Sequence, residues 1–415
     1  MANQESYSQA FIEPEEIFEE HILEQQIIEP MFEEEPLFKE EPLFKEVPLF
    51  KEVPLFEEEP FIEEVGSPME EDNEEQSEMI EIKDDSVQGF FNHKDSVYAI
   101  DINPINEDII ISGGGDDKSF LWRCDTGEQL FELSGHTDSV TNTLFSKDGQ
   151  YIASGGMDGK VKVWKVENGQ LILSLEGSDE ITWLDWHPKG NILLAGANDG
   201  TIWMWQIPSG NCMNVFAGHS SIVTTGQFTP DGKRIVSGSE DNSLIVWDPK
   251  TAISTLKISG EDARFHREGI TCIAINREST LAITGSTDTT AKLVNLTNGN
   301  NLLRPLDSQI LATGSIDGKL NIWDVKTMRL RQTCNHDDAI IKLQWHKESP
   351  LITTCSADRT VRVWDSRTGK CETTFHGHQD AILGFAMSRD GKKIVTASDD
   401  HNNIFHSSNI SDEKK

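Results

Sequence analysis

Residues 358–365 read Asp-Arg-Thr-Val-Arg-Val-Trp-Asp, in which a turn aspartate is followed by a short alternating strand that ends in tryptophan six residues later. The same spacing between an aspartate and the end of a strand-like run recurs along the chain, at Asp116–Trp122, Asp158–Trp164, Asp199–Trp205, Asp241–Trp247, Asp288–Val294, Asp317–Trp323 and Asp400–His406. Most neighbouring runs are 41 or 42 residues apart. A fixed period of this length is the signature of a repeat architecture.

Each repeat consists of short strands separated by turns such as Ser146-Lys147-Asp148-Gly149. Four antiparallel strands fit into one period, and a sheet of this size buries both its faces only by stacking on its neighbours around an axis. The sequence therefore predicts an all-β fold, a β-propeller of eight repeats over residues 86–410. We expect residues 87–91 to supply an outermost strand that closes the ring beside residues 403–406.

The residues that open and close the repeats resemble those of the WD40-repeat family. Trp-Asp pairs occur at residues 247–248, 323–324 and 364–365, and Gly-His pairs at residues 135–136, 218–219 and 377–378. The resemblance implies a hydrogen-bonded tetrad in each complete blade, in which an aspartate orients a histidine and the buried polar groups satisfy one another. The implied tetrads are His93, Ser112, Asp116 and Trp122; His136, Ser154, Asp158 and Trp164; His219, Ser237, Asp241 and Trp247; and His336, Thr354, Asp358 and Trp364.

Recurrent histidine, serine and aspartate also make up a hydrolytic triad, but a nucleophile set occurs once, in a cleft, whereas this set occurs four times at similar spacing. The glycine run at residues 113–115 lacks the Lys-Ser/Thr that a phosphate-binding loop requires. The chain also lacks the paired ligand spacing of a metal site. We therefore expect a protein that is not an enzyme, with no catalytic residue, cofactor or metal.

Four repeats depart from the pattern. The third has Gly177 and Ala195 in place of histidine and serine, so its tetrad is absent, while the fifth has Val294 and the eighth His406 in place of tryptophan. The sixth is short, because only 29 residues separate Val294 from Trp323, and no segment remains for its inner strand and opening histidine. Either this blade is truncated or the sequence has lost a piece.

Residues 1–85 differ in character from the repeats. The hexapeptide Glu-Pro-Leu-Phe-Lys-Glu and close variants recur between residues 35 and 58. Regular prolines interrupt helices and strands, and glutamates repel one another, so we expect a disordered acidic tail. Its Leu-Phe pairs are either docking motifs or part of a solvating tail. The first 90 residues hold 29 of the 71 acidic residues and 4 of the 36 basic ones, and the remainder is also acidic.

An acidic chain repels phosphates, so a basic protein segment is a better partner than nucleic acid. The propeller loops that precede the inner strands and those that join the middle strands open on one face. The carboxylates expected there are Asp95, Asp117, Asp138, Asp179, Glu180, Glu240, Glu268, Asp337, Asp338, Asp380 and Asp399. They either bind a partner or cap tight turns. Trp183 and Trp203 either anchor a partner side chain or pack in the core.

Several stretches, among them residues 114–122, 183–188, 201–205 and 284–294, resemble one branch of the WD40 family, that of the angio-associated migratory cell protein and its fungal counterpart, the suppressor of truncated QM protein. The resemblance implies a ribosome-assembly chaperone that holds the basic N-terminus of a large-subunit ribosomal protein of the QM type on an acidic face. The alternatives are a signalling or cell-migration scaffold and a substrate adaptor of a ubiquitin ligase.

Compartment and assembly are indicated by what the sequence lacks. The six cysteines are scattered without a CxxC pair, the first residues do not form a signal-peptide pattern, and apolar runs of about 18 residues are missing. We expect a soluble, monomeric protein of the cytoplasm, or of both cytoplasm and nucleus, with no membrane span and no direct nucleic-acid partner.

Overall fold

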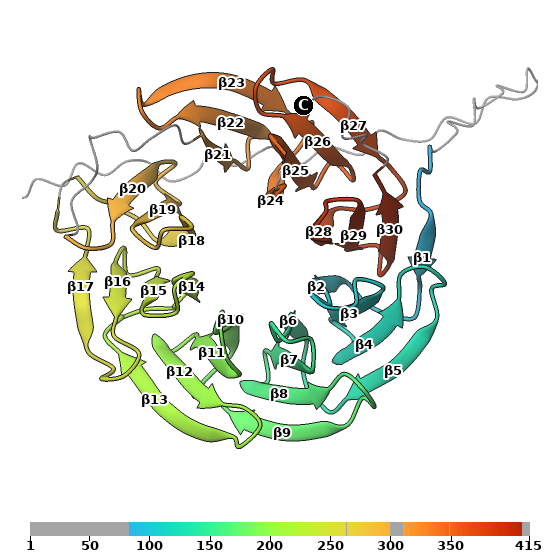
Figure 1. Ribbon diagram of the computed structural model, residues 1–415, viewed down its shortest axis with the longest axis horizontal. Helices are drawn as coiled ribbons and strands as arrows, with labels where there is room; N and C mark the ends of the chain where they lie inside the picture. The colour runs from blue at the N-terminus through green and yellow to red at the C-terminus, as the bar shows by residue number, and fades with distance from the viewer. Residues whose placement is uncertain (1–82, 263, 299–309, 348, 409–415) are drawn as a thin grey trace, which may run out of the picture. The chain divides into compact units, whose positions relative to one another are not determined.

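The computed structural model describes residues 83–408, except for residues 263, 299–309 and 348. The expected tail, residues 1–85, lies outside the described residues apart from its last three. The described residues form eight antiparallel sheets around a common axis, so the predicted eight-bladed, all-β propeller is confirmed (Figure 1). Each sheet is one blade, numbered in chain order, and the strands of a complete blade lie side by side from the axis to the rim.

Five blades contain four strands that are consecutive in the chain. Blade 1 contains β2 (Val97–Ile102), β3 (Ile109–Gly114), β4 (Lys118–Arg123) and β5 (Gln129–Ser134), and blade 2 contains β6 (Val140–Phe145), β7 (Tyr151–Gly156), β8 (Lys160–Lys165) and β9 (Leu171–Glu176). Blade 3 contains β10 (Ile181–Trp186), β11 (Ile192–Ala197), β12 (Thr201–Gln206) and β13 (Asn211–Ala217). Blade 4 contains β14 (Thr225–Phe228), β15 (Ile235–Gly238), β16 (Leu244–Trp247) and β17 (Ser254–Ile258). Blade 7 contains β24 (Ile340–Trp345), β25 (Leu351–Ser356), β26 (Val361–Asp365) and β27 (Cys371–Phe375).

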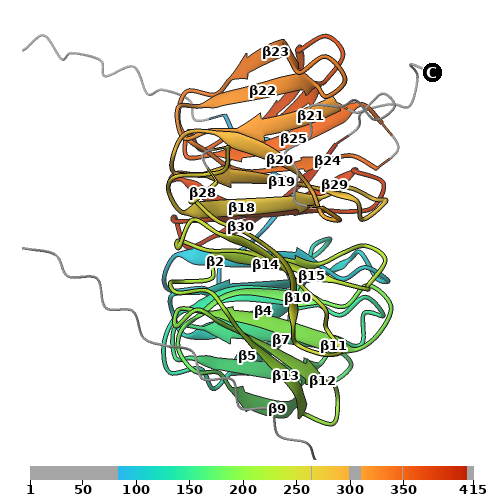
Figure 2. The ribbon, with the colours of Figure 1, turned by 90° about the vertical axis from the view of Figure 1, so that its left-hand side faces the viewer.

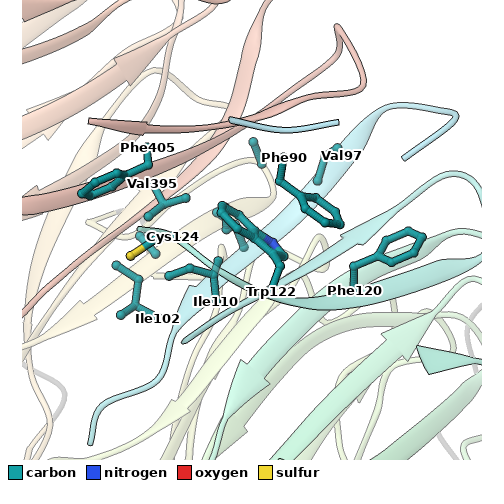
Figure 3. Close-up of a cluster of buried hydrophobic side chains, with 12 residues drawn as sticks. Phe90, Val97, Ile102, Ile110, Phe120, Trp122, Cys124, Val395 and Phe405 are labelled. Carbon is teal, nitrogen blue, oxygen red and sulfur yellow. The ribbon is translucent and has the colours of Figure 1, made fainter. Parts of the chain in front are cut away.

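Blade 8 joins the two ends of the propeller. Its strands β28 (Ile382–Met387), β29 (Lys393–Ser398) and β30 (Asn403–Ser407) come from the end of the chain, and its rim strand β1 (Gln88–Phe90) comes from the beginning. β1 pairs antiparallel with β30, with Gln88 opposite Phe405, which confirms the predicted ring closure. The buried ring of Phe90 stacks on Trp122 of blade 1 with 5.0 Å between ring centroids, inside the cluster drawn in Figure 3.

Blades 5 and 6 contain three strands each in the described residues. Blade 5 contains β18 (Ile270–Ile275), β19 (Leu281–Ser286) and β20 (Ala291–Asn295), and blade 6 contains β21 (Ile310–Gly314), β22 (Lys319–Asp324) and β23 (Arg329–Asn335). Trp323 lies in β22, in the place of the third strand of a complete blade, so the described residues of blade 6 contain no inner strand. Residues 299–309, which connect β20 of blade 5 to β21 of blade 6, lie outside the described part of the chain.

Polar side chains join neighbouring inner strands in addition to apolar packing. The Asp101 carboxylate in β2 accepts a hydrogen bond of 2.9 Å from the backbone N–H of Phe145 in β6, and Asp185 in β10 accepts one of 2.8 Å from Phe228 in β14. Burial raises the pKa of both carboxyl groups, that of Asp185 to about 6. The two aspartates therefore link adjacent blades near the axis.

Candidate docking face

In every blade except blade 6, two loops lie together at one end of the described strands. The loop before the inner strand accepts a backbone hydrogen bond from the loop between the second and third strands, as in Gly115 N to Ser96 O, 2.9 Å, and Ala357 N to Ala339 O, 2.9 Å. The same bond occurs in blades 2, 3, 4, 5 and 8. Because every blade runs in the same direction around the axis, these loops form one face of the ring, and Figure 2 shows the loops gathered at the two ends of the strands.

The side chains of the four implied tetrads lie within hydrogen-bonding distance of one another. In blade 7, His336 Nδ1 is 2.7 Å from the Asp358 carboxylate, His336 Nε2 is 2.7 Å from Thr354 Oγ1, and the Trp364 indole N–H donates to the same hydroxyl at 2.8 Å. The corresponding bonds are 2.9–3.2 Å around His93, 2.8–3.0 Å around His136 and 2.8–3.2 Å around His219. The network connects the docking loops to the blade interior.

Two further blades carry three of the four residues. His266 bonds to Asp288 at 3.0 Å and to Thr284 at 2.8 Å in blade 5, and the same bonds around His378 in blade 8 reach Asp400 and Thr396. Sequence reasoning noted the substitutions at the tryptophan position and did not assign these triads. The signal was present, because the spacing of 18 residues from histidine to hydroxyl and 22 to aspartate matches that of the complete tetrads.

Burial and charge give these networks a structural role. The tetrad hydroxyls, for example those of Ser154 and Thr354, are inaccessible to a substrate. Burial alone raises the pKa of the Asp358 carboxyl, but hydrogen bonds from His336, Thr360 and the Asp337 N–H outweigh it and hold the pKa well below its usual range. A carboxylate held ionised beside a buried, bonded histidine orients the loop above it, and the hydroxyl has no room to attack an ester or amide.

In place of a tetrad, the third blade has a hydrogen-bond network around Trp203. Gly177 stands at the histidine position, and the half-buried Trp203 directs its indole N–H to Thr201 Oγ1 at 2.9 Å and to Ser178 Oγ at 3.2 Å. Thr201 in turn donates to Asp199 at 2.7 Å. The N–H of Trp203 is therefore bonded inside the blade, and its side chain remains half-buried.

Trp183 cannot serve as the partner anchor that was one of the two expectations for it. Its side chain is 7 % exposed and packs between blades 3 and 4. Two glycines make this space, because a Cβ at Gly196 would lie 2.0 Å from the indole nitrogen and one at Gly226 would lie 2.3 Å from the ring. Core packing is the role that the structure gives Trp183.

The expected carboxylates are on the docking loops, and all are exposed except Asp117, which is half-buried. Five of those before the inner strands accept a hydrogen bond from the next backbone N–H, at 2.6–2.8 Å: Asp95, Asp138, Asp179, Asp338 and Asp380. Capping a turn and presenting charge are thus compatible, because one carboxylate oxygen caps the loop while the other forms no bond among the described residues.

The remaining acids differ in how much charge they present. Asp337 forms an ion pair of 2.8 Å with Arg362, and Asp399 accepts a hydrogen bond from Ser96 of blade 1, so both are partly compensated. The side chains of Glu180, Glu240 and Glu268 form no hydrogen bond or ion pair in the part of the chain that the structure describes. Together with the half-buried Asp117, these three glutamates are the least compensated charges of the docking face.

Two depressions in this face lie beside uncompensated glutamates. The first, of about 390 Å³, lies between blades 2 and 3 and is lined by Met157, Asp158, Gly159, Lys160, Glu176, Gly177, Ser178, Asp179 and Glu180. The second, of about 420 Å³, lies between blades 4 and 5 and is lined by Thr224, Glu240, Asn242, Arg267, Glu268, Gly269, Ile270, Thr271 and Thr287. The first contains one basic residue with four acids, and the second contains one basic residue with two, so their chemistry suits a cationic or amide-bearing side chain.

The ring of stacked blades with polar tetrads and a loop-built face defines a repeat propeller of the protein-binding type. The family model described as WD domain, G-beta repeat matches residues 127–165, 169–206, 210–248, 263–295, 305–324, 328–365 and 369–405. The chain therefore belongs to the WD40-repeat family. Among the described residues, no helix is long and apolar enough to cross a membrane.

Relatives with longer similarity belong to the branch that the sequence resembled. The chain is 38 % identical over 346 residues to the angio-associated migratory cell protein of Homo sapiens, covering 77 % of this chain and 79 % of the relative. It is 39 % identical over 354 residues to an uncharacterised WD repeat-containing protein of Schizosaccharomyces pombe, covering 80 % and 88 %. Similarity on this scale supports a shared fold and a shared arrangement of blades.

A solved structure adds a bound segment to the comparison. Sqt1 from Chaetomium thermophilum, bound to the N-terminus of the ribosomal protein L10, matches with a TM-score of 0.73 and 26 % sequence identity, covering 79 % of this chain and all of that one. Sqt1 of Saccharomyces cerevisiae has the same TM-score at 22 % identity, which shows the fold alone.

Proposed function

We propose that this protein is a non-enzymatic chaperone that holds the basic N-terminal segment of a large-subunit ribosomal protein on its acidic docking face. The observation that carries the proposal is the set of exposed carboxylates, several of them uncompensated, on loops that the buried tetrads hold in place. The similar Sqt1 structure bound to the N-terminus of L10 supports it. A role beside the ribosome would place the protein in the cytoplasm and nucleus.

The physical basis is complementarity of charge around a rigid frame. Carboxylates gathered on one face focus a negative potential, which attracts a basic segment and raises its association rate. The two depressions beside Glu180 and Glu240 offer places for individual side chains. Because the loops are fixed by backbone hydrogen bonds and tetrads, the propeller itself loses little conformational entropy when the segment binds.

The test is a titration of the full chain with a peptide from the N-terminus of ribosomal protein L10. Reversing Asp138, Asp338 and Asp380 to Lys should weaken binding roughly a hundredfold, because each exposed charge contributes up to about 1 kcal/mol and its reversal adds repulsion. Wild-type affinity should also fall steeply between low and physiological salt, where the screening length is about 8 Å.

A matched control reverses three aspartates on the opposite face. Asp148, Asp231 and Asp390 cap the turns between first and second strands, each accepting a hydroxyl hydrogen bond of 2.6–2.7 Å, so their reversal changes net charge and local capping in the same way. Equal weakening by both triple variants would mean that net charge alone attracts the peptide. Salt-insensitive binding, or equal affinity of the wild type and the docking-face variant, would reject the proposal.

A second candidate is a scaffold that acts in cell migration. The observation that favours it is the name of the relatives at 38 % identity, the angio-associated migratory cell protein. Failure of the L10 peptide to bind under any salt condition would leave this candidate as the better one, with the half-exposed Trp203 as the first residue to substitute.

A further inference from the structure

The face opposite the docking face contains the turns between the first and second strands of the blades. In blades 2–5, whose inner strands follow one another around the axis in Figure 1, these turns are residues 146–150, 187–191, 229–234 and 276–280. Each of the four turns exposes a basic side chain, and we name these four residues the basic arc: Lys147, Lys189, Lys233 and Arg277. The arc is a positively charged surface on a chain whose formal net charge is −35.

The aspartates of these turns are bonded within the protein. One carboxylate oxygen of Asp148 accepts a hydrogen bond of 2.6 Å from Ser146 Oγ, and the other accepts one of 3.0 Å from Asn191 Nδ2. The Asp231 carboxylate accepts one of 2.6 Å from Thr229 Oγ1. These carboxylates therefore stabilise the turns and do not pair with the neighbouring cations.

Most cations of the arc have no such partner. Among the described residues, three of the four basic side chains form no hydrogen bond and no ion pair: Lys147, Lys233 and Arg277. The charge of Lys147 also acts on the carboxyl groups of Asp101 and Asp185, but both are buried, and burial raises the pKa of each. The donor groups of the three exposed side chains thus remain available to a ligand.

Hydrogen bonds also join each turn of the arc to the next. The bond from Asn191 to Asp148 connects blade 3 to blade 2. Lys189 Nζ donates to the backbone oxygen of Asp231 in blade 4 at 3.2 Å, and the N–H of Asp231 donates to Ser279 Oγ of blade 5 at 3.0 Å. The spacing of the cations is therefore fixed before a partner binds, which reduces the entropy that the propeller loses on binding.

An apolar side chain lies at the blade 1 end of the arc. Ile105, in the corresponding turn of blade 1, is 66 % exposed, and a Cβ at Gly149 of blade 2 would lie 3.0 Å from its Cγ1. Two acids follow in the same turn, but Glu107 accepts a hydrogen bond from the backbone N–H of Arg389, and Asp108 pairs with Lys393 of blade 8. A ligand that reaches Lys147 also meets Ile105.

Two classes of polyanion fit a positive arc, an acidic protein segment and a nucleic acid, and two observations favour the protein. Stacking of bases on aromatic rings contributes much of the affinity for single-stranded nucleic acid, and none of the four turns contains Phe, Tyr or Trp. The chain is also net acidic outside its first 90 residues, so a long phosphate backbone is repelled beyond the arc.

We propose that the basic arc binds an extended acidic segment of another protein, with an apolar side chain of that segment in contact with Ile105. The cations attract and orient the segment, and the exposed isoleucine selects for its apolar residue. The arc lies on the opposite face from the docking loops, so the two surfaces have ligands of opposite charge. This inference goes beyond the proposed function and does not depend on it.

The test titrates the full chain with a labelled synthetic peptide of glutamates that contains one leucine. We expect saturable binding, which Lys147→Glu, Lys233→Glu and Arg277→Glu together should weaken about tenfold or more, because three attractions become repulsions. The matched control changes three exposed lysines at the rim of the same face to Glu and should leave binding within about twofold, because these positions lie outside the arc: Lys165, Lys250 and Lys370. Thermal unfolding of both triple variants checks that each retains the fold.

A single variant tests the apolar contact separately. Ile105→Ser should weaken binding of the leucine-containing peptide about threefold, because apolar area is no longer buried, and should leave a peptide of glutamate and serine unaffected. Equal loss for both peptides would contradict a contact between the leucine and Ile105.

Other outcomes would overturn the assignment of the arc. Equal weakening by the rim control would mean that net charge alone attracts the peptide, and absence of saturable binding would exclude the site. Tighter binding of a labelled single-stranded RNA, lost in the arc variant, would assign the arc to nucleic acid. Because the arc and the docking face are tested with peptides of opposite charge and with separate variants, failure of either proposal leaves the other standing.

Discussion

Blades 7 and 6 contain the same pair of polar residues in different surroundings. In both, an indole N–H donates to a threonine hydroxyl ten residues earlier, from Trp364 to Thr354 at 2.8 Å and from Trp323 to Thr313 at 3.0 Å. Trp364 is buried at 5 % exposure, whereas Trp323 is half-buried and has no histidine beside its threonine. The hydrogen bond is thus a local property of the repeat, and the burial that makes it valuable comes from the neighbouring strands.

The strongest test of this comparison removes the burial that the closing strand β1 supplies to blade 8. Phe90 of the rim strand β1 is fully buried on Trp122, so Phe90→Ala should cost about 3–5 kcal/mol of unfolding free energy through lost burial and a cavity. Leu330→Ala in the exposed rim strand of blade 6 should cost less than about 1 kcal/mol. Urea denaturation of the full chain measures both, and similar losses would contradict the importance of the closing strand.

A second test sharpens the contrast between the tetrad and its incomplete counterpart. Asp358→Ala should cost about 2–4 kcal/mol, because it leaves His336 and backbone donors unsatisfied in a buried network. Asp317, the equivalent of Asp358 in blade 6, is exposed and pairs with Lys319 at 2.7 Å, so Asp317→Ala should leave the free energy of unfolding almost unchanged.

The pH dependence of stability, compared between the wild type and the Asp358→Ala variant, gives an independent check on the tetrad. The pKa of the Asp358 carboxyl is lowered by folding, so its contribution to stability is present above its ordinary pKa of about 4 and is lost as the pH falls toward the lower folded-state value. The wild type should therefore lose more free energy of unfolding than the Asp358→Ala variant does between pH 5 and pH 3, an interval that spans the ordinary pKa of about 4. Parallel acid-unfolding curves would show that the tetrad carboxylate is not linked to folding.

The smallest expected effect concerns the turn between the third and fourth strands of a blade. Gly369 in blade 7 has a backbone φ of +72° there, and Met328, between β22 and β23, has one of +53°. Gly369→Met should cost about 1–3 kcal/mol, because a side chain in the left-handed region would meet Gln332 of blade 6. Met328→Gly should change stability by less than about 1 kcal/mol, since relief of strain is offset by the greater freedom of glycine in the unfolded chain. Thermal unfolding of the two variants distinguishes them, and equal destabilisation would mean that both turns are equally crowded.

The repeat pattern predicted the fold because each blade repeats the same local rule. The six-residue spacing from aspartate to tryptophan fixes a turn, a third strand and the tetrad at once, and the Phe90 strand was recognisable from its position before the first repeat. The short interval between Val294 and Trp323 was also recognisable from the sequence, and it was assigned to the inner strand of blade 6, which the described residues do not contain.

The candidate site was predictable in location and less so in detail. Acids two residues after each histidine lie on the docking loops, because the histidine fixes that loop in space. Packing between blades determines that Trp183 is buried. Glycines at residues 196 and 226 make room for its ring, and spacing along one strand does not reveal a glycine in the next blade.

The pairing of β1 with β30 has a consequence for how the protein is made. The two partners are separated by roughly 300 residues, which a ribosome adds in about 15–60 s at 5–20 residues per second. Until then the first blade lacks its final neighbour, and Phe90 has no β30 strand to hold it over Trp122. Translation of β30 therefore sets the earliest moment at which the ring can close, because the nascent chain cannot become a closed, protected ring before β30 is available to pair with β1.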